Sequence, residues 1–140
     1  MECTVSWMGD PGMAFVASTG SGHIVAMDGA PEGGGNNLAP RPMEMVLLGT
    51  GGCTAYDVVL ILKKSRQDVH GCAVKLEAER ASSDPEVFTR INFHFTVTGR
   101  NLNRATVERA IHLSHEKYCS ASIMLGKTAD LTHTLDIVEA

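Results

Sequence analysis

Residues 42–65 read PMEMVLLGTGGCTAYDVVLILKKS. Pro42 suits the first position of a helix, and Glu44 lies where the helix dipole favours an acid, whereas the basic residues from Lys63 onward lie where it favours cations. The stretch therefore predicts one helix of about 24 residues, from Pro42 to roughly Ser65. Its middle is apolar almost all round, which is typical of a helix that is covered on every side.

The chain has too few other elements to cover such a helix on all sides, because few other helices are predicted in its 140 residues. We therefore expect a homodimer in which the partner covers the remaining face. The small residues Gly49, Gly51, Gly52 and Ala55 would let another backbone approach closely. Residues 45–62 have the length of a membrane span, but Asp57 in their middle favours a buried soluble helix and no membrane partner.

Composition places the chain among ordinary globular proteins. Of its 140 residues, 44% are hydrophobic and 20% are charged, which excludes disordered and collagen-like chains. The length fits a single domain, residues 1–140, whose core needs no metal or disulfide to hold it. A net charge of -4 lacks the electrostatic footprint of a nucleic-acid binder. The N-terminus has no signal-peptide pattern, so we expect a cytoplasmic protein with reduced thiols.

Short alternating segments precede the long helix. Three strands are expected at residues 2–8, 13–18 and 23–27, and together they predict an antiparallel meander within residues 1–28. Residues 29–41, which contain a Gly-Gly-Gly-Asn-Asn run, predict a flexible loop.

Residues 42–140 predict the order helix, two strands, helix and strand. After the long helix, the strands are expected at residues 69–81 and 87–98, a helix from Arg104 to Tyr118 that continues or restarts through Cys119 to Leu125, and a last strand at residues 131–138. In the second of these strands Ile91, Phe93, Phe95 and Val97 share one face. Asn103 is expected to cap the second helix. The whole order indicates an α+β fold rather than a repeating βαβ pattern.

The four cysteines divide into two pairs by their context. Cys3 and Cys72 alternate in phase with apolar strand residues, so we expect both to be small core residues. Cys53 and Cys119 lie among small or polar residues on predicted helices, which leaves a redox role open. No two cysteines have the short spacing of zinc ligands, and the six histidines are scattered, so we expect no metal and no other cofactor.

Asp57 follows Cys53 by four residues and shares its helical face. Its negative charge would oppose formation of a thiolate at Cys53 unless a cation neutralised it. The alternative is structural: Asp57 pairs with a cation or caps a polar network.

Three motifs combine into a recognisable pattern. They are Pro42-Met43-Glu44-Met45, Gly51-Gly52-Cys53-Thr54-Ala55 and Tyr118-Cys119-Ser120. Together with the element order they resemble the OsmC/Ohr family, and within it the YhfA-like branch, over nearly the whole chain. The resemblance implies an OsmC-like fold with antiparallel sheets around a long buried central helix, in an intertwined homodimer with active sites at the subunit interface.

The resemblance also implies a thiol-dependent peroxidase that serves in the oxidative stress response. The cysteine matching Cys53 would reduce a peroxide and become a sulfenic acid, and the one matching Cys119 would condense with it to a disulfide. An external dithiol would then restore both thiols. Cys53 and Cys119 are therefore the expected catalytic residues.

Two departures from the family pattern concern the groups that support the reactive thiol. The family's peroxidases carry an Arg between the early strands, whereas residues 18–23 contain none. They also carry Glu where this chain has Met43, and Glu44 comes one position later. Arg41, Glu44 and Asp57 are the candidates for supporting roles.

The second hypothesis comes from another functional class. The Met-rich, Gly-rich long helix and the missing Arg also fit a non-catalytic dimeric module that binds an apolar small molecule or partner, because Met supplies an adaptable apolar surface.

Overall fold

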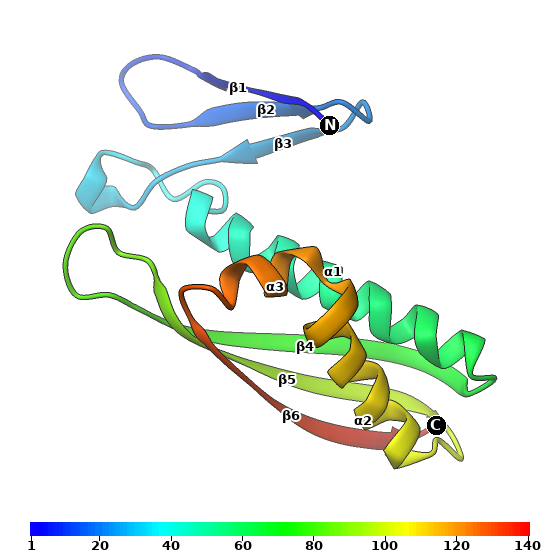
Figure 1. The fold of residues 1–140 in the computed structure, drawn as a ribbon. Coiled ribbons are helices and arrows are strands. Elements are labelled where there is room, and N and C mark those ends of the chain that lie inside the picture. The colour runs from blue at the N-terminus through cyan, green and yellow to red at the C-terminus, as the bar shows by residue number, and fades with distance from the viewer. The chain divides into compact units, whose positions relative to one another are not determined.

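A computed structural model describes all 140 residues of the chain. The α+β class predicted from the sequence is confirmed, with two three-stranded sheets and one long helix (Figure 1). The chain forms two compact units, residues 1–48 and 49–140.

The first unit contains the predicted antiparallel meander. Its strands are β1 (Cys3–Trp7), β2 (Phe15–Thr19) and β3 (Ile24–Met27), paired in the order β1-β2-β3. The prediction that Cys3 is a core residue is wrong, because Cys3 is exposed, as is every residue of β1. β1 is one of the two edge strands of this sheet. Alternation along a strand does not reveal whether another layer covers its apolar side.

Asp28 organises the segment that was expected to be a flexible loop. Its carboxylate accepts hydrogen bonds from the backbone N–H groups of Gly29 at 2.7 Å, Leu38 at 3.1 Å and Asn36 at 3.3 Å. These hydrogen bonds hold the pKa of Asp28 below its usual range, and the bond from Gly29 contributes most. The segment also contains the short 3-10 helix η1 (Pro31–Gly33).

The long helix is α1 (Pro42–Lys64), within one residue of the predicted bounds. Its buried residues form one stripe: Thr50, Gly51, Thr54, Val58 and Leu62. The other residues of α1 are half-buried or exposed. The expectation that a partner copy covers this remaining face stays a prediction. The length and composition of α1 alone would allow it to cross a membrane, which is weak evidence, because core helices share these properties.

The second sheet has the order β4-β5-β6, with β4 (Asp68–Arg80), β5 (Phe88–Arg100) and β6 (Asp130–Glu139). β4 and β5 are antiparallel, as the expectation of antiparallel sheets requires, whereas β5 and β6 are parallel, so this pair differs from the expectation. The helical segment between β5 and β6 explains the difference, because parallel neighbours need a crossover connection.

The helices of the second unit cover one face of this sheet (Figure 1). The side chains that β5 presents to them have no exposed surface and form the predicted apolar face: Ile91, Phe93, Phe95 and Val97. Burying this face stabilises the packing of the helices on the sheet.

The crossover contains α2 (Arg104–Leu113), the π-helical turn η2 (Ser114–Tyr118) and α3 (Ser120–Leu125). Asn103 caps α2 as predicted, since its side chain accepts a hydrogen bond from the Thr106 N–H at 2.9 Å. The expected α-helix to Tyr118 ends early, because the chain widens into η2 at Ser114. The helix then restarts after Cys119, one of the two possibilities that the sequence left open.

Candidate active site

Cys53 and Asp57 lie one turn apart on α1, beside its buried stripe. Thr50, Thr54 and Val58 fix the orientation of the helix because they are its buried contacts with the rest of the unit. Gly51 permits the close approach to β4, since a Cβ at this position would come within 2.7 Å of the Leu76 Cδ1 atom. Cys53 itself is half-buried.

Cys119 is held at the junction between η2 and α3. Its backbone N–H donates to the Ser114 carbonyl at 2.7 Å, which closes the wide π-helical turn. Its Sγ accepts a hydrogen bond from the Ser122 N–H at 3.4 Å, so the side chain caps α3. The residue is completely buried. A π-helical turn often marks a functional site.

The fold brings Cys53, Asp57 and Cys119 together. The two Sγ atoms and a carboxylate oxygen of Asp57 all lie within 4.8 Å of one another. Two of these groups come from α1 and one from the crossover between β5 and β6, so only the folded unit assembles them. The structure therefore unites the two cysteines that the sequence singled out.

A hydroxyl network supports Asp57. The Ser114 Oγ donates to Asp57 Oδ2 at 3.0 Å and lies 2.9 Å from the Thr54 Oγ1. Because the single hydroxyl proton of Ser114 goes to the carboxylate, Thr54 must donate to Ser114. Thr54 and Ser114 are both completely buried. The sequence left open whether Asp57 pairs with a cation or caps a polar network, and the structure shows the polar network.

Sequence reasoning did not assign Thr54 and Ser114 to the site. The sequence did contain an indication: Thr54 and Ser114 are small polar residues at positions where the helical spacing predicts a buried side chain. Buried hydroxyls need hydrogen-bond partners, so such positions indicate a nearby polar group.

Burial dominates the electrostatics of Cys119. It raises the pKa of the Cys119 thiol, and the neighbouring Cys53 raises it further, whereas the hydrogen bonds from Ser122 act in the opposite direction and are outweighed. The start of α3 at Ser120 therefore does not make Cys119 the more acidic thiol that a helix N-terminus could favour.

His115, next to Ser114 in η2, supplies no positive charge at neutral pH. Its ring packs against Phe93 with the ring centroids 4.6 Å apart and stacks on His133 at 6.0 Å. Both ring nitrogens are buried without a hydrogen-bond partner. Burial, with smaller contributions from His133 and His112, lowers the pKa of His115 to about 4.

Arg41 and Glu44 are joined to each other rather than to the two thiols. The Glu44 Oε1 accepts a hydrogen bond from the Arg41 backbone N–H at 2.9 Å. This bond satisfies one of the free N–H groups at the start of α1, as in a capping box. Neither side chain takes part in an ion pair, and both residues belong to the first unit.

Comparison with known proteins identifies the family of this chain. The family model described as OsmC-like protein matches residues 33–134. The chain belongs to the OsmC-like family. Among individual OsmC-like relatives, Protein YhfA of Escherichia coli K12 is 49% identical over 140 residues, which cover 100% of both chains.

Solved OsmC-like structures share the fold. One is an organic hydroperoxide resistance protein OsmC from Legionella pneumophila, with a TM-score of 0.71, 17% identity and 97% of each chain covered. Another is an organic hydroperoxide resistance protein from Elizabethkingia anophelis, with a TM-score of 0.70, 15% identity and coverage of 96% of this chain and 93% of that one. At these identities the likeness establishes the OsmC-like fold alone.

Proposed function

We propose that this OsmC-like chain is a thiol-dependent hydroperoxide reductase in which Cys53 attacks the peroxide and Cys119 resolves the product. The observation that carries the proposal is the placement of two thiols from distant segments within 4.8 Å of each other. Their unequal burial supports the order of action, because Cys53 is half-buried whereas Cys119 is completely buried. The names of the Legionella and Elizabethkingia proteins point to the same substrate class.

The reaction consists of three balanced steps. The Cys53 thiolate attacks one peroxide oxygen, the O–O bond breaks, and the other oxygen leaves as an alcohol or water after taking up a proton. The Cys119 sulfur then attacks the sulfenic acid sulfur, so that an S–S bond forms and water leaves. An external dithiol reduces the disulfide by thiol–disulfide exchange and is itself oxidised.

The second step requires the two sulfurs to move closer, since a disulfide has an S–S length of about 2.05 Å. Cys119 lies at the junction between η2 and α3, where the pattern of helical hydrogen bonds changes. In this scheme a small change of the backbone at the junction brings the two sulfur atoms into bonding distance. In this scheme Asp57 supports the site through Ser114 and Thr54, which tie α1 to η2. Arg41 and Glu44 support it by capping the start of α1.

Peroxide consumption by variant proteins tests the proposal. With an organic hydroperoxide and excess dithiothreitol, we expect Cys53→Ser to lose turnover. In the absence of dithiothreitol, which would itself reduce a sulfenic acid, Cys119→Ser should still reduce one equivalent of peroxide per chain and should accumulate a sulfenic acid that dimedone traps. Cys72→Ser is the matched control, because burial raises the pKa of this strand thiol and it lies outside the cluster.

Undiminished turnover in Cys53→Ser would overturn the assignment. So would equal loss of turnover in Cys72→Ser, because the reactive thiol would then not be the one on α1. Mass spectrometry of the wild type after one equivalent of peroxide adds an independent readout, since the proposal requires a disulfide between Cys53 and Cys119.

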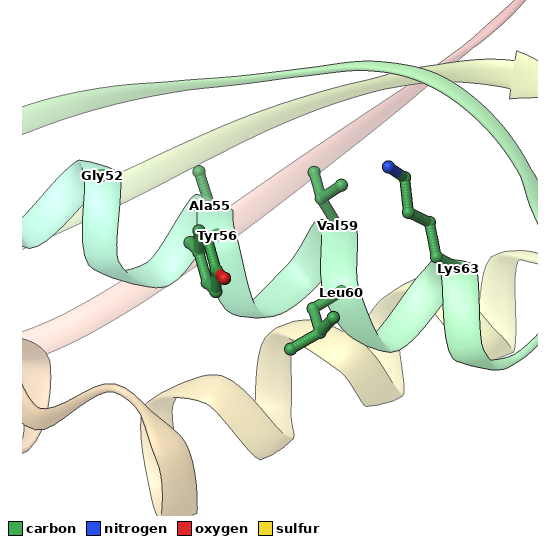
Figure 2. Close-up of a pocket in the computed structure, with 6 residues that line it drawn as sticks. All are labelled: Gly52, Ala55, Tyr56, Val59, Leu60 and Lys63. Carbon is green, nitrogen blue, oxygen red and sulfur yellow. The ribbon is translucent and has the colours of Figure 1, made fainter.

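We also propose that the protein works as a homodimer whose second copy covers the free side of α1. Figure 2 shows this side, where Gly52, Ala55, Tyr56, Val59, Leu60 and Lys63 line a groove of about 430 Å³. Tyr56 is 72% exposed and Leu60 39% exposed, although both are large apolar side chains. Such side chains on a long central helix favour an interface over open solvent.

Light scattering coupled to size exclusion tests the dimer. We expect a dimeric wild type and a shift toward monomer in Leu60→Glu, because burying an unpaired charge in an apolar contact is costly. Val87→Glu is the matched control, since Val87 is also 39% exposed but lies in the connection between β4 and β5. A monomeric wild type would contradict the proposal.

The binding-module hypothesis remains the second candidate because of the same apolar groove. Native mass spectrometry of the freshly purified protein distinguishes the two functions. A retained apolar small molecule together with no peroxide turnover would favour the module, and rapid turnover with no retained molecule favours the reductase. We place the reductase in the cytoplasm, where the dithiol pool keeps thiols reduced, and cell fractionation checks that location.

A further inference from the structure

The cluster of Cys53, Asp57 and Cys119 has the composition of a metal site as well as that of a redox site. It offers two sulfur ligands and one carboxylate oxygen, all within 4.8 Å of one another. In a tetrahedral zinc site with metal–ligand bonds of about 2.0–2.3 Å, neighbouring ligand atoms lie roughly 3.5–4 Å apart. The three groups therefore need to move by only about 1 Å to hold one ion.

None of the ion pairs of the chain includes Asp57. The groups that contact the cluster are neutral: the Ser114 hydroxyl donates to Asp57, and Ser122 donates to Cys119 beside the Cys53 thiol. With both thiols ionised the cluster would carry three negative charges in a largely buried place. A divalent cation removes this repulsion, because it binds the ionised form of each ligand.

The surroundings of Asp57 also fit a metal ligand. Ser114 donates to Oδ2, while no hydrogen bond to Oδ1 is formed. A ligating carboxylate is characteristically oriented by such a hydrogen bond from an outer group. Ser114 is in turn held by the buried Thr54, so the carboxylate has a fixed direction.

We propose that the reduced protein binds one Zn²⁺ per chain through the Sγ atoms of Cys53 and Cys119 and one carboxylate oxygen of Asp57. Two thiolates select a borderline-soft ion such as Zn²⁺ over Mg²⁺ and Ca²⁺, which prefer oxygen ligands. Three protein ligands leave the fourth tetrahedral position to a water molecule or a small external thiol. Binding releases the thiol protons.

Zinc binding is incompatible with the peroxidase cycle, and this consequence rests on the proposed function. Both sulfurs would be occupied by the ion, so Cys53 could not attack a peroxide. Conversely, a disulfide between Cys53 and Cys119 removes both sulfur ligands. Zinc would thus inhibit peroxide reduction by the reduced site, and formation of the disulfide would release the zinc ion.

Cobalt serves as the probe, because Co²⁺ takes the same ligands and its thiolate bonds absorb in the near ultraviolet. The reduced, chelator-treated full-length protein is titrated anaerobically with CoCl₂ and then with ZnCl₂. We expect one Co²⁺ per chain, an absorption of the strength of two thiolate bonds, and its loss when Zn²⁺ displaces the cobalt. Wild type without any thiolate-to-cobalt absorption would overturn the inference.

Variants assign the ligands. Asp57→Asn should weaken Co²⁺ binding at least tenfold, since even outer residues of metal sites are worth about 10–100-fold in affinity. Cys53→Ser and Cys119→Ser should each lose half of the absorption, and Cys72→Ser should lose none. Unchanged affinity in Asp57→Asn, or a loss in Cys72→Ser, contradicts the assignment.

Two measurements keep the test independent of folding and of the proposed function. Far-ultraviolet circular dichroism shows which variants fold, and wild type carrying the Cys53–Cys119 disulfide must fail to bind cobalt even if Cys119→Ser does not fold. Peroxide turnover is measured separately on metal-free protein. Cobalt binding without turnover refutes the reductase and keeps the zinc site, whereas turnover without cobalt binding refutes the zinc site alone.

Discussion

The Ser114 hydroxyl donates a hydrogen bond to the Asp57 carboxylate across 3.0 Å and so joins η2 to α1. Ser114 also accepts a hydrogen bond from Thr54, one turn earlier on α1. Thr54, Ser114 and Asp57 thus form a hydrogen-bonded bridge between α1 and η2. The bridge therefore ties α1, which carries Cys53, to the turn that Cys119 follows directly.

Removing Ser114 tests the bridge. Ser114→Ala leaves Asp57 and Thr54 without their partner in a buried place, and a buried polar group that loses its hydrogen bond costs about 1–3 kcal/mol. We expect a loss of that size in the free energy of unfolding by urea. Ser83→Ala, in the exposed turn between β4 and β5, is the control and should change stability by less than about 0.5 kcal/mol.

Two glycines of the loop between β3 and α1 should differ in their response to substitution by alanine. A Cβ at Gly35 would overlap the backbone carbonyl of Gly29, whereas a Cβ at Gly33 meets nothing within 4 Å. Because backbone cannot move aside like the end of a side chain, we expect Gly35→Ala to cost about 2 kcal/mol or more and Gly33→Ala to be nearly neutral. Thermal unfolding of both variants measures this, and equal melting temperatures would contradict it.

His115 makes stability fall in mild acid. Because burial lowers its pKa to about 4, the unfolded chain, with a His pKa near 6.5, takes up the proton first as the pH falls. The stability is therefore fully present above pH 6.5 and decreases toward pH 4. After allowance for solvent screening of this partly exposed residue, we expect a loss of about 1–2 kcal/mol.

His115→Leu, which has a similar volume, should flatten that decrease without lowering stability at pH 7, since it also removes two buried unpartnered nitrogens. Urea titrations between pH 7 and pH 4 give the comparison. The exposed His23→Gln serves as the control and should keep the wild-type slope. A wild-type slope in His115→Leu as well would show that another group causes the decrease.

Asp28 should add a second loss of stability at lower pH. Its backbone hydrogen bonds hold its folded-state pKa below the value near 4 of the unfolded chain, so the stabilisation is present above that value and is lost as the pH falls through the folded pKa. Asp28→Asn keeps one acceptor oxygen but cannot ionise. We expect it to be less stable at pH 7 and to show a weaker acid dependence below pH 4, measured by circular dichroism.

The elements with strong periodicity could be predicted from the sequence. The bounds of α1 follow from Pro42 and the terminal lysines, and the buried face of β5 follows from strict alternation at Ile91, Phe93, Phe95 and Val97. These patterns are local, so one chain reveals them. The exposure of Cys3 and the direction of β6 are not local, since they depend on which other elements lie alongside.

The candidate site could be predicted only in part. Cys53 and Cys119 were recognisable because they fall outside the strand patterns, and the family resemblance paired them. The proximity of their sulfurs depends on η2, and residues 107–118 keep a spacing that also suits an ordinary α-helix. The wide turn at Ser114, closed by the Cys119 N–H, has no signature in that spacing.

The antiparallel hairpin of β4 and β5 lies between the two thiols in the sequence. A protease cut in its exposed connection, residues 82–86, would leave Cys53 on one fragment and Cys119 on the other, held together by the paired strands. Oxidation would then join two polypeptides covalently. The state of the site would become visible as a change in molecular mass on a non-reducing gel.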